Sequence, residues 1–109
     1  MESVTSAWLH ERGLLHDARV RDMRSSPSSI QIDLDDEWAS LRGLEKPAGQ
    51  ESPGTLVLKG YTIIEGDMTS MRGGWISEIT ADGDRLTFVF CDKPPLLLRA
   101  TAVQWRSTA

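Results

Sequence analysis

The sequence contains very little that would fix its fold covalently or hold it in a membrane. Cys91 is the only cysteine among its 109 residues, so no disulfide can form within the chain and the core must stabilise the fold. The longest strongly apolar run spans residues 96–98, far short of the roughly eighteen residues of a membrane helix. No apolar leader follows a charged start. We expect a soluble, cytoplasmic protein without membrane contacts.

Positive charge is also scarce. Twelve lysines and arginines stand against sixteen acidic residues, a net charge of -4, and the basic residues form no stripe along the sequence. Nucleic acid is therefore not expected as a partner, because a phosphate backbone is recognised by clustered basic side chains. The acidic excess falls in residues 1–54, with ten acidic and six basic side chains. Such a half would suit a basic protein.

Aromatic residues are few, yet four of the seven are tryptophans. Each tryptophan can bury on the order of 200 Å². We interpret them first as core residues, with an exposed cluster for a partner as the alternative. Two methionines in the loop at residues 66–74 have no periodic place and join this group. The candidate contact residues are Trp8, Trp38, Met68, Met71 and Trp105.

The clearest structural signal is the segment WISEITADGDRLTFVF at residues 75–90. Asp82-Gly83 suits a two-residue hairpin turn with positive φ, and the flanking residues alternate between apolar and polar. The large apolar side chains then share one face, as in a sheet that is buried on one side. The predicted pairs are Ala81 with Asp84, Ile79 with Leu86, Ser77 with Phe88, and Trp75 with Phe90.

Four further alternating segments predict strands, at residues 14–23, 30–34, 55–65 and 96–105. In the first, Leu14, His16, Ala18 and Val20 share the inward face. Gly60 is expected to kink or bulge the third. The last is partly apolar on both faces.

The other segments read as caps and loops. A short helix or arm is expected in residues 1–13, capped by Ser3 or Thr5 and ended by Gly13. Residues 35–41 predict a helical turn, and residues 43–54 a surface loop that divides no domain. Together the pattern predicts one all-β domain over residues 1–109, with its core in residues 14–106. It is an antiparallel β-sandwich or a small partly open barrel of about six strands.

His16 and Asp17 are the most suggestive pair for catalysis or metal binding, since a histidine beside a carboxylate is the raw material of both. Adjacent strand residues point to opposite faces, however. We therefore interpret His16 as a partly buried histidine bonded to a backbone group. The alternative is a small hydrolase or metal-dependent enzyme in which His16 works with nearby carboxylates. The candidates for these are Asp17, Asp33 and Glu37.

Two other features have unremarkable interpretations. Asp33, Asp35, Asp36 and Glu37 lack the spacing of a calcium loop, so no metal or cofactor is expected. Cys91 follows the apolar Phe90 and is interpreted as a small buried hydrophobe, not a nucleophile.

Residues 14–34, LLHDARVRDMRSSPSSIQIDL, resemble the opening of a loose group of small bacterial proteins of unknown function. In these proteins a Leu-His-Asp-Ala or Phe-His-Asp-Ala strand begins a hairpin of an all-β domain. Some similar proteins are assigned as immunity proteins against polymorphic toxins. The resemblance implies that His16 and Asp17 are signature positions and implies no catalytic residues.

Binding without catalysis is the function that these observations favour, as an immunity-like or homo-oligomeric module. The partner would be another protein or a second copy of the chain. Besides the enzyme, the remaining alternative is a carrier of a small apolar ligand, with a cavity lined by Trp and Phe.

Overall fold

The computed structural model describes residues 2–16, 18–35 and 54–107. The strands are β1 (Glu2–Ser3), β2 (Arg19–Ser25), β3 (Ser29–Asp35), β4 (Gly54–Lys59), β5 (Thr62–Glu65), β6 (Ile76–Asp82), β7 (Arg85–Phe90), β8 (Leu96–Arg99) and β9 (Ala102–Ser107). The helices are α1 (Ser6–Glu11) and two 3₁₀ turns, η1 (Gly13–Leu15) and η2 (Met68–Met71). The helical turn predicted at residues 35–41 and nearly all of the loop at 43–54 lie outside the described residues.

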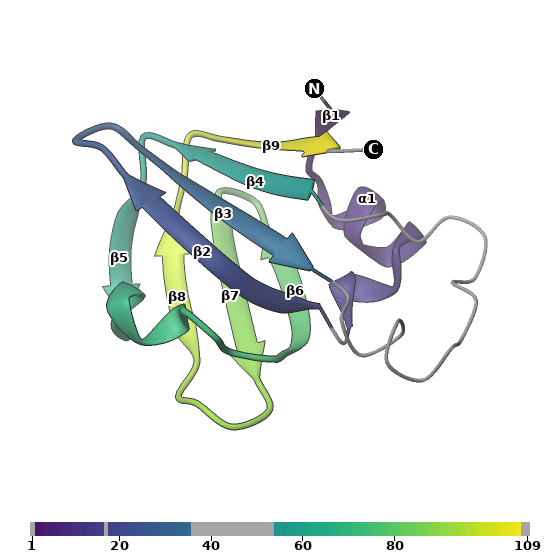
Figure 1. Ribbon diagram of the computed structural model, residues 1–109. Helices are drawn as coiled ribbons and strands as arrows, with labels where there is room; N and C mark the ends of the chain where they lie inside the picture. Colours follow the sequence, from purple (N-terminus) through teal and green to yellow (C-terminus); the bar gives the residue numbers. More distant parts are fainter. Residues whose placement is uncertain (1, 17, 36–53, 108–109) are drawn as a thin grey trace.

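The strands form two antiparallel sheets that face each other (Figure 1). The five-stranded sheet has the order β1-β9-β4-β3-β2, and the four-stranded sheet the order β5-β8-β7-β6. At one side, β2 is tied to the segment entering β6, because Val20 N donates to Gly74 O and Ile76 N to Ala18 O. The predicted small all-β sandwich is confirmed.

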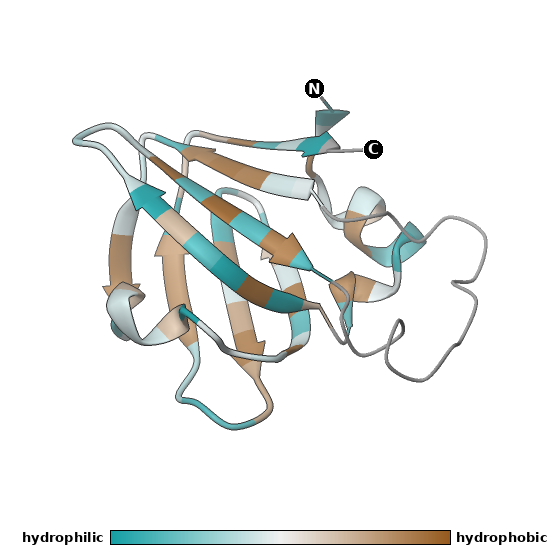
Figure 2. Ribbon diagram, in the orientation of Figure 1, coloured by the Kyte–Doolittle hydropathy of each residue, from teal (hydrophilic) through white to brown (hydrophobic). Residues whose placement is uncertain are grey.

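The core follows from alternation along the strands. In β3, Ile30, Ile32 and Leu34 are buried while the residues between them are only half-buried. Brown and teal bands alternate along this strand in Figure 2. Leu56 and Leu58 of β4 and Phe88 of β7 are fully buried in the same apolar cluster. Residues of opposite parity therefore form the outer faces of the sandwich.

Two predicted strands each proved to be two strands in different sheets. Residues 55–65 divide into β4 and β5 at Gly60, which has φ 59°, and residues 96–105 divide into β8 and β9 at Thr101. The two crossings touch, since Thr101 donates from N (2.9 Å) and from Oγ1 (3.0 Å) to Lys59 O. A Cβ at Gly60 would lie 2.4 Å from Thr101 Oγ1. The kink expected at Gly60 is thus a corner between sheets.

The β6–β7 hairpin forms with a different turn from the predicted one. Asp82 pairs with Arg85, so the turn residues are Gly83 and Asp84. Gly83 has φ 61° and Asp84 is not left-handed, which matches the φ signs of a type II′ turn. The predicted pairs were wrong by two positions, but this shift preserves parity. Near the turn, the side chains that were predicted to face inward therefore do so.

A bulge at Ser77 changes the face at the start of β6. The register shifts between Ile76 and Glu78, and Ile76 pairs with Phe90. Ile76 is fully buried, whereas Trp75, the predicted partner of Phe90, is half-buried and lies beside Arg19. Alternation alone could not find the extra residue that a bulge inserts.

The N-terminal arm covers one end of the sandwich. Thr5 caps α1 by accepting a hydrogen bond from Trp8 N at 3.1 Å, as one of the two predicted caps. Trp8 and Leu9 are buried, and the ring centroids of Trp8 and Trp105 lie 5.5 Å apart. At the start of the arm, β1 pairs with β9.

The strand predicted from residue 14 instead begins at Arg19. Gly13, Leu14 and Leu15 have φ of 62°, 57° and 53°, a left-handed turn that interrupts the inward alternation. This conformation costs a non-glycine residue about 1–2 kcal/mol. Burial of Leu15 offsets part of that cost.

Candidate functional site

His16 is exposed, so its predicted inward position was wrong. The left-handed turn at residues 13–15 lifts it off the sheet. Its predicted backbone bond is present, since Nδ1 lies 2.6 Å from the carbonyl oxygen of Ser77. A carbonyl oxygen can only accept, so Nδ1 carries the proton. Ser77 is the bulged residue of β6, and His16 therefore satisfies a backbone acceptor at an irregular point of the sheet.

The alternative enzyme site, His16 with nearby carboxylates, is only partly within the described residues. Asp17 and Glu37 lie outside them, and Asp33 is engaged by Arg24 and Thr55. In residues 2–16, 18–35 and 54–107, no three His, Cys, Asp or Glu side chains are grouped to hold a metal ion. Cys91 is exposed just after β7, so its predicted burial was wrong.

Packing accounts for three of the candidate contact residues. Trp8, Met71 and Trp105 are at most 7% exposed and belong to the core. Met68 is half-buried against that core, and Trp38 lies outside the described residues. A role for these five residues in binding stays a prediction.

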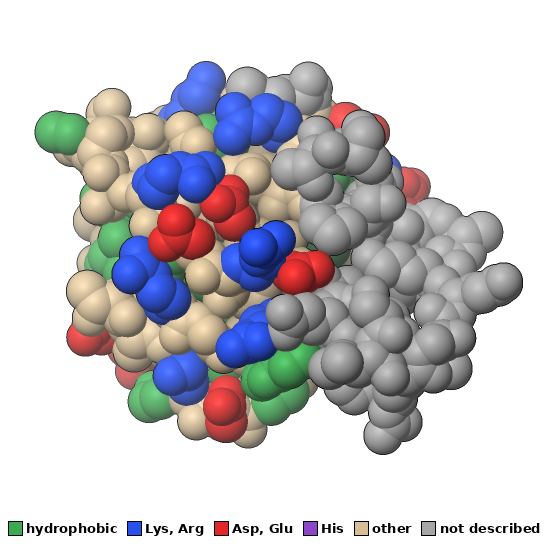
Figure 3. All heavy atoms as spheres, viewed as in Figure 1, with side chains coloured by type: hydrophobic (Ala, Val, Ile, Leu, Met, Phe, Trp, Pro, Cys, Tyr) green, Lys and Arg blue, Asp and Glu red, His purple; other side chains and the backbone are tan. Residues whose placement is uncertain are grey.

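Charged side chains gather on the outer face of the five-stranded sheet. Because Ile30, Ile32 and Leu34 point inward, Gln31, Asp33 and Asp35 point outward. Blue and red side chains gather over this sheet in Figure 3. We call this surface the arginine face; its charged members are Arg21, Asp22, Arg24, Asp33, Asp35, Arg72 and Arg106.

Arg24 and Asp33 form the shortest of the ion pairs described on this face. Across the β2–β3 hairpin, Arg24 Nη1 donates to Asp33 Oδ2 at 2.7 Å and Nη2 to Oδ1 at 3.0 Å. Thr55 Oγ1 on the neighbouring β4 donates to the same Oδ1 at 2.7 Å. Thr55 is only 2% exposed although it lies on the outer face. The pair is thus bidentate and anchored to a central strand.

The pKa of Asp33 reflects these contacts. Partial burial acts to raise the pKa of this carboxyl. Hydrogen bonds from Arg24 and Thr55, with the positive charges of Arg24 and Arg106, outweigh burial and hold the pKa below its ordinary value. Asp33 is therefore a fixed negative charge at neutral pH.

The other arginines of this face differ in how closely they approach a carboxylate. Arg72 pairs with Asp22 at 2.9 Å, whereas Arg21 and Asp35 are 3.8 Å apart. Arg106 Nη2 donates to Gln31 Oε1 at 3.3 Å. Among the described residues, no carboxylate lies within ion-pair distance of Arg106.

Arg21 and Arg106 line one hollow of about 630 Å³ on this face. Asp22, Arg24, Asp33 and Thr55 also line it. Alternation on β2 and β3 could have indicated part of this set. Arg72 and Arg106 come from distant segments, and their place depends on the tertiary fold.

Comparisons with protein-family models, curated proteins and solved structures find no match to this chain. Within the described residues, no helix has the length and apolar character needed to cross a membrane.

Proposed function

We propose that this protein acts by binding a partner protein through the arginine face, with an acidic side chain of the partner entering the hollow between Arg21 and Arg106. One observation carries the proposal: three guanidinium groups line one hollow, and two of them, those of Arg21 and Arg106, are not tightly paired with a described carboxylate. Arg106 has no carboxylate partner among the described residues. Arg21 has a long contact, with 3.8 Å between its Nε and Asp35 Oδ2. Guanidinium groups bind carboxylates in a planar, bidentate geometry and are enriched at interface hot spots.

Rigidity of the surrounding face also supports the proposal. Arg24, Asp33 and Thr55 are locked together on three adjacent strands. Binding to such a surface would require little ordering of side chains, which favours affinity. The fixed carboxylates of Asp22 and Asp33 beside the hollow would select the partner's charge pattern.

A more specific role as an immunity-like protein rests on the resemblance at residues 14–34 and stays part of this proposal. The acidic half of the sequence suggested a basic partner. The arginine face favours an acidic contact, because it brings together basic residues that are scattered in the sequence. A second copy of the chain is the other partner to test, since the face carries both signs of charge.

Charge reversal on this face is the direct test. Tagged full-length chain, expressed in its native cells, would be purified at low ionic strength with its bound proteins. We expect at least one protein to be retained by the wild type and reduced more than about tenfold by Arg21→Glu with Arg106→Glu, because charge reversal in an interface costs several kcal/mol. Gel filtration of the pure chain would reveal a dimer.

Arg99→Glu provides the matched control, since Arg99 is exposed on the opposite sheet. It should retain the partner. All three substitutions are at exposed residues, so melting temperatures should be little changed. The proposal would be contradicted if the chain with Arg21→Glu and Arg106→Glu recovered every bound protein as well as the Arg99→Glu chain does.

A further inference from the structure

Three arginines line a second, smaller hollow at the β2 edge of the five-stranded sheet. It measures about 320 Å³ and lies between β2 and the segment entering β6. We call it the Arg19 hollow; its described lining residues are Arg19, Val20, Arg21, Arg72 and Gly73. None of these is acidic, so the hollow concentrates positive charge on a chain whose net charge is -4.

A β-bulge in β2 places Arg21 at this hollow. The register of β2 shifts between Val20 and Asp22, so Arg21 is an extra residue without a partner on β3. The carboxylate of Asp35, which pairs with Arg19, lies 3.8 Å from Arg21 Nε. Both arginines are therefore on the outer face of the sheet. Bulges are common next to binding sites, because they re-aim a side chain.

The segment entering β6 supplies the third arginine. Gly73 N donates to Val20 O at 2.8 Å, which ties this segment to β2. Gly73 has φ 78°, and a Cβ at this position would meet nothing within 4 Å, so the space beside the backbone is open. Arg72 is held by its Nη2, which lies 2.9 Å from Asp22 Oδ1 and donates to Met23 O at 3.2 Å.

These arginines keep N–H donors for a ligand. Among the described residues, Nη1 and Nε of Arg72 have no hydrogen-bond partner, and neither does the guanidinium group of Arg21. Arg19 is oriented by Trp75, whose ring centroid lies 5.5 Å from its guanidinium carbon. Guanidinium groups donate paired hydrogen bonds to carboxylate and phosphate oxygens. Three of them around one hollow suit an anion with several oxygens and more than one charge.

A phosphate monoester has these properties. Its phosphate carries a charge of about -1.5 to -2 at neutral pH and three acceptor oxygens. A carboxylate has one charge and two oxygens. The hollow is at the small end of the range of about 300–1,000 Å³ typical of ligand sites, which suits a single phosphate on a small molecule. Asp22 and Asp35 beside it disfavour a longer polyanion by like-charge repulsion.

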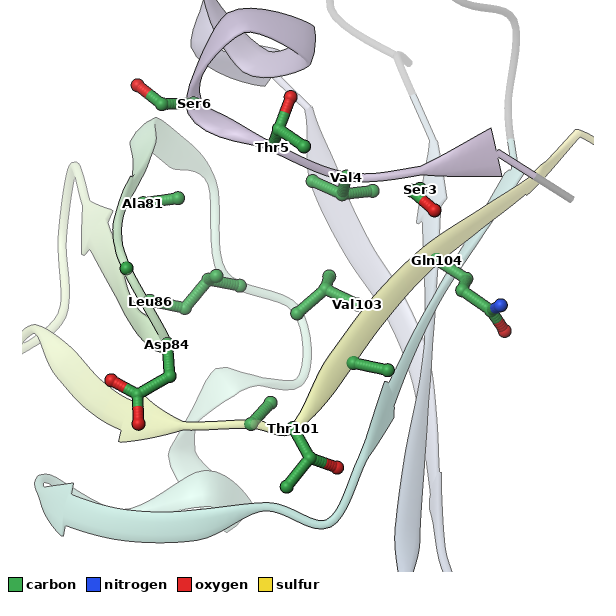
Figure 4. A pocket seen from close by; sticks show the side chains of 13 residues that line it. Ser3, Val4, Thr5, Ser6, Ala81, Asp84, Leu86, Thr101, Val103 and Gln104 are labelled. Atoms are coloured by element: carbon green, nitrogen blue, oxygen red, sulfur yellow. The ribbon is translucent and has the colours of Figure 1, made fainter.

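Two larger hollows are less suited to a dianion. Asp22 and Asp33 line the hollow between Arg21 and Arg106. The hollow at the end of the sandwich, between the N-terminal arm, the β6–β7 turn and the crossing from β8 to β9, is shown in Figure 4. Asp84 lines it, and none of its described lining residues is basic. Like charges therefore oppose a phosphate in both.

We propose that the Arg19 hollow binds the phosphate group of a small phosphate monoester, with Arg19, Arg21 and Arg72 around the phosphate oxygens. The described lining of this hollow shares only Arg21 with the hollow proposed for a partner protein. Phosphate binding requires no partner protein, so either proposal can fail without the other.

The probe is methyl phosphate, titrated as the dianion into the ¹⁵N-labelled full chain at low ionic strength and followed by NMR. We expect saturable shifts of the amides of Arg19, Arg21, Arg72 and Gly73, with a Kd of about 1–10 mM. The amide of Asp84, in the hollow of Figure 4, should not shift. Methyl sulfate and acetate, each with one negative charge, should bind at least about fivefold more weakly.

The informative chain carries Arg19→Gln and Arg72→Gln, and Arg106→Gln is its control. Arg106 belongs to the same face but lines only the hollow proposed for the partner protein. The double variant should weaken methyl phosphate binding at least about tenfold, and each single variant about threefold. Arg106→Gln should leave the Kd unchanged.

The single variants keep the test decisive if the double variant does not fold. The proposal would be overturned by wild-type affinity in the Arg19→Gln and Arg72→Gln chains, or by an equal loss of affinity in Arg106→Gln. Equal binding of methyl sulfate, or no saturable shift at the amides of the Arg19 hollow, would overturn it as well.

Discussion

Gly60 and Gly83 have nearly the same backbone conformation but different surroundings. Their φ angles are 59° and 61°, so alanine at either position meets left-handed strain of about 1 kcal/mol or more. At Gly60 the new Cβ would also meet Thr101 Oγ1 at 2.4 Å, while nothing lies within 4 Å at Gly83. Denaturant unfolding should show a loss of about 1 kcal/mol for Gly83→Ala and about 2–4 kcal/mol for Gly60→Ala.

A double-mutant cycle separates strain from collision. Thr101→Gly removes the obstructing side chain, so Gly60→Ala should cost about 1 kcal/mol less in that background. Equal costs for the two alanine variants in the wild-type chain would mean that the corner is looser than described.

Asp33 makes the stability of the folded chain depend on pH, and the direction of this dependence follows from its pKa. Its pKa in the folded chain lies below its ordinary value of 3.8. The contribution of Asp33 to stability is therefore present above that value and is lost as the pH falls through it toward the folded pKa. At neutral pH, Asp33→Asn should lower the free energy of unfolding by about 1 kcal/mol, because it weakens a bidentate ion pair.

Thermal melts over a series of pH values would check this sign. The difference between wild type and Asp33→Asn should shrink as the pH falls below 3.8. Asp82→Asn, an exposed hairpin variant, supplies the control. A difference that grows in acid would show that Asp33 does not act through its negative charge.

Cys91 tests the position of a single side chain. Because the residue is exposed after β7, a thiol reagent should label it in the native chain nearly as fast as in denaturant, within about tenfold. The buried position predicted from the sequence would instead give slow labelling of the native chain. Strong protection of the native thiol would restore the buried interpretation.

At the scale of elements, side-chain alternation predicted the faces of strands better than their ends. Ile79, Leu86 and Phe88 face inward as predicted, although the turn moved from Asp82-Gly83 to Gly83-Asp84. A shift of two positions in the pairing conserves parity, so burial could not distinguish the two registers. The bulge at Ser77 depends on contacts from another segment and gives no local signal.

Corners were missed for a related reason. Residues 55–65 and 96–105 read as continuous strands, because a chain that passes between two sheets can stay extended and keep apolar residues on both sides. Gly60 marked one corner, whereas Ala100 and Thr101 carry no turn signal. Alternation assigned Asp33 of β3 to the outer face, whereas on β2 a register shift between Val20 and Asp22 brings Asp22 and Arg24 to that face against the alternation. The hollow between the N-terminal arm, the β6–β7 turn and the crossing from β8 to β9 could not be predicted, because it joins three segments far apart in the sequence.

His16 connects the left-handed turn at residues 13–15 to the bulge in β6. Its Nδ1–H donates to the carbonyl oxygen of the bulged Ser77. His16→Ala should cost about 1 kcal/mol, since water can replace an exposed hydrogen bond only in part. NMR shifts should concentrate at residues 76–78.

His10→Ala is the matched control, because His10 Nδ1 bonds to Ser6 O within α1. Its NMR changes should stay in that helix. If His16→Ala left the β6 amides unperturbed, His16 would have no part in holding the bulge.

At the scale of the whole molecule, the residues that pack the core differ from those proposed to bind a partner. Trp8 and Trp105, two of the aromatic residues that the sequence offered for a partner, lie in the core. The arginine face is an array of charged side chains on the outside of one sheet. The N-terminal arm buries Trp8 and Leu9 and also lines a hollow at the end of the sandwich, so it is part of the core and of that surface.

Trp8→Ala tests whether the arm is an integral part of the fold. Trp8 is buried against Trp105, and its indole Nε1 donates to Glu2 Oε2 at 3.2 Å. Loss of a buried tryptophan costs about 3–5 kcal/mol, enough to lower the Tm of a domain of this size by at least 10 °C. Trp75→Ala, at a half-buried tryptophan outside the core cluster, should cost clearly less. Amides of Val4 and Val103 should also shift in Trp8→Ala, because the hydrogen bond from Val4 N to Val103 O holds the arm to β9. A Trp8→Ala chain that melts within a few degrees of wild type would mean that the arm is only loosely attached.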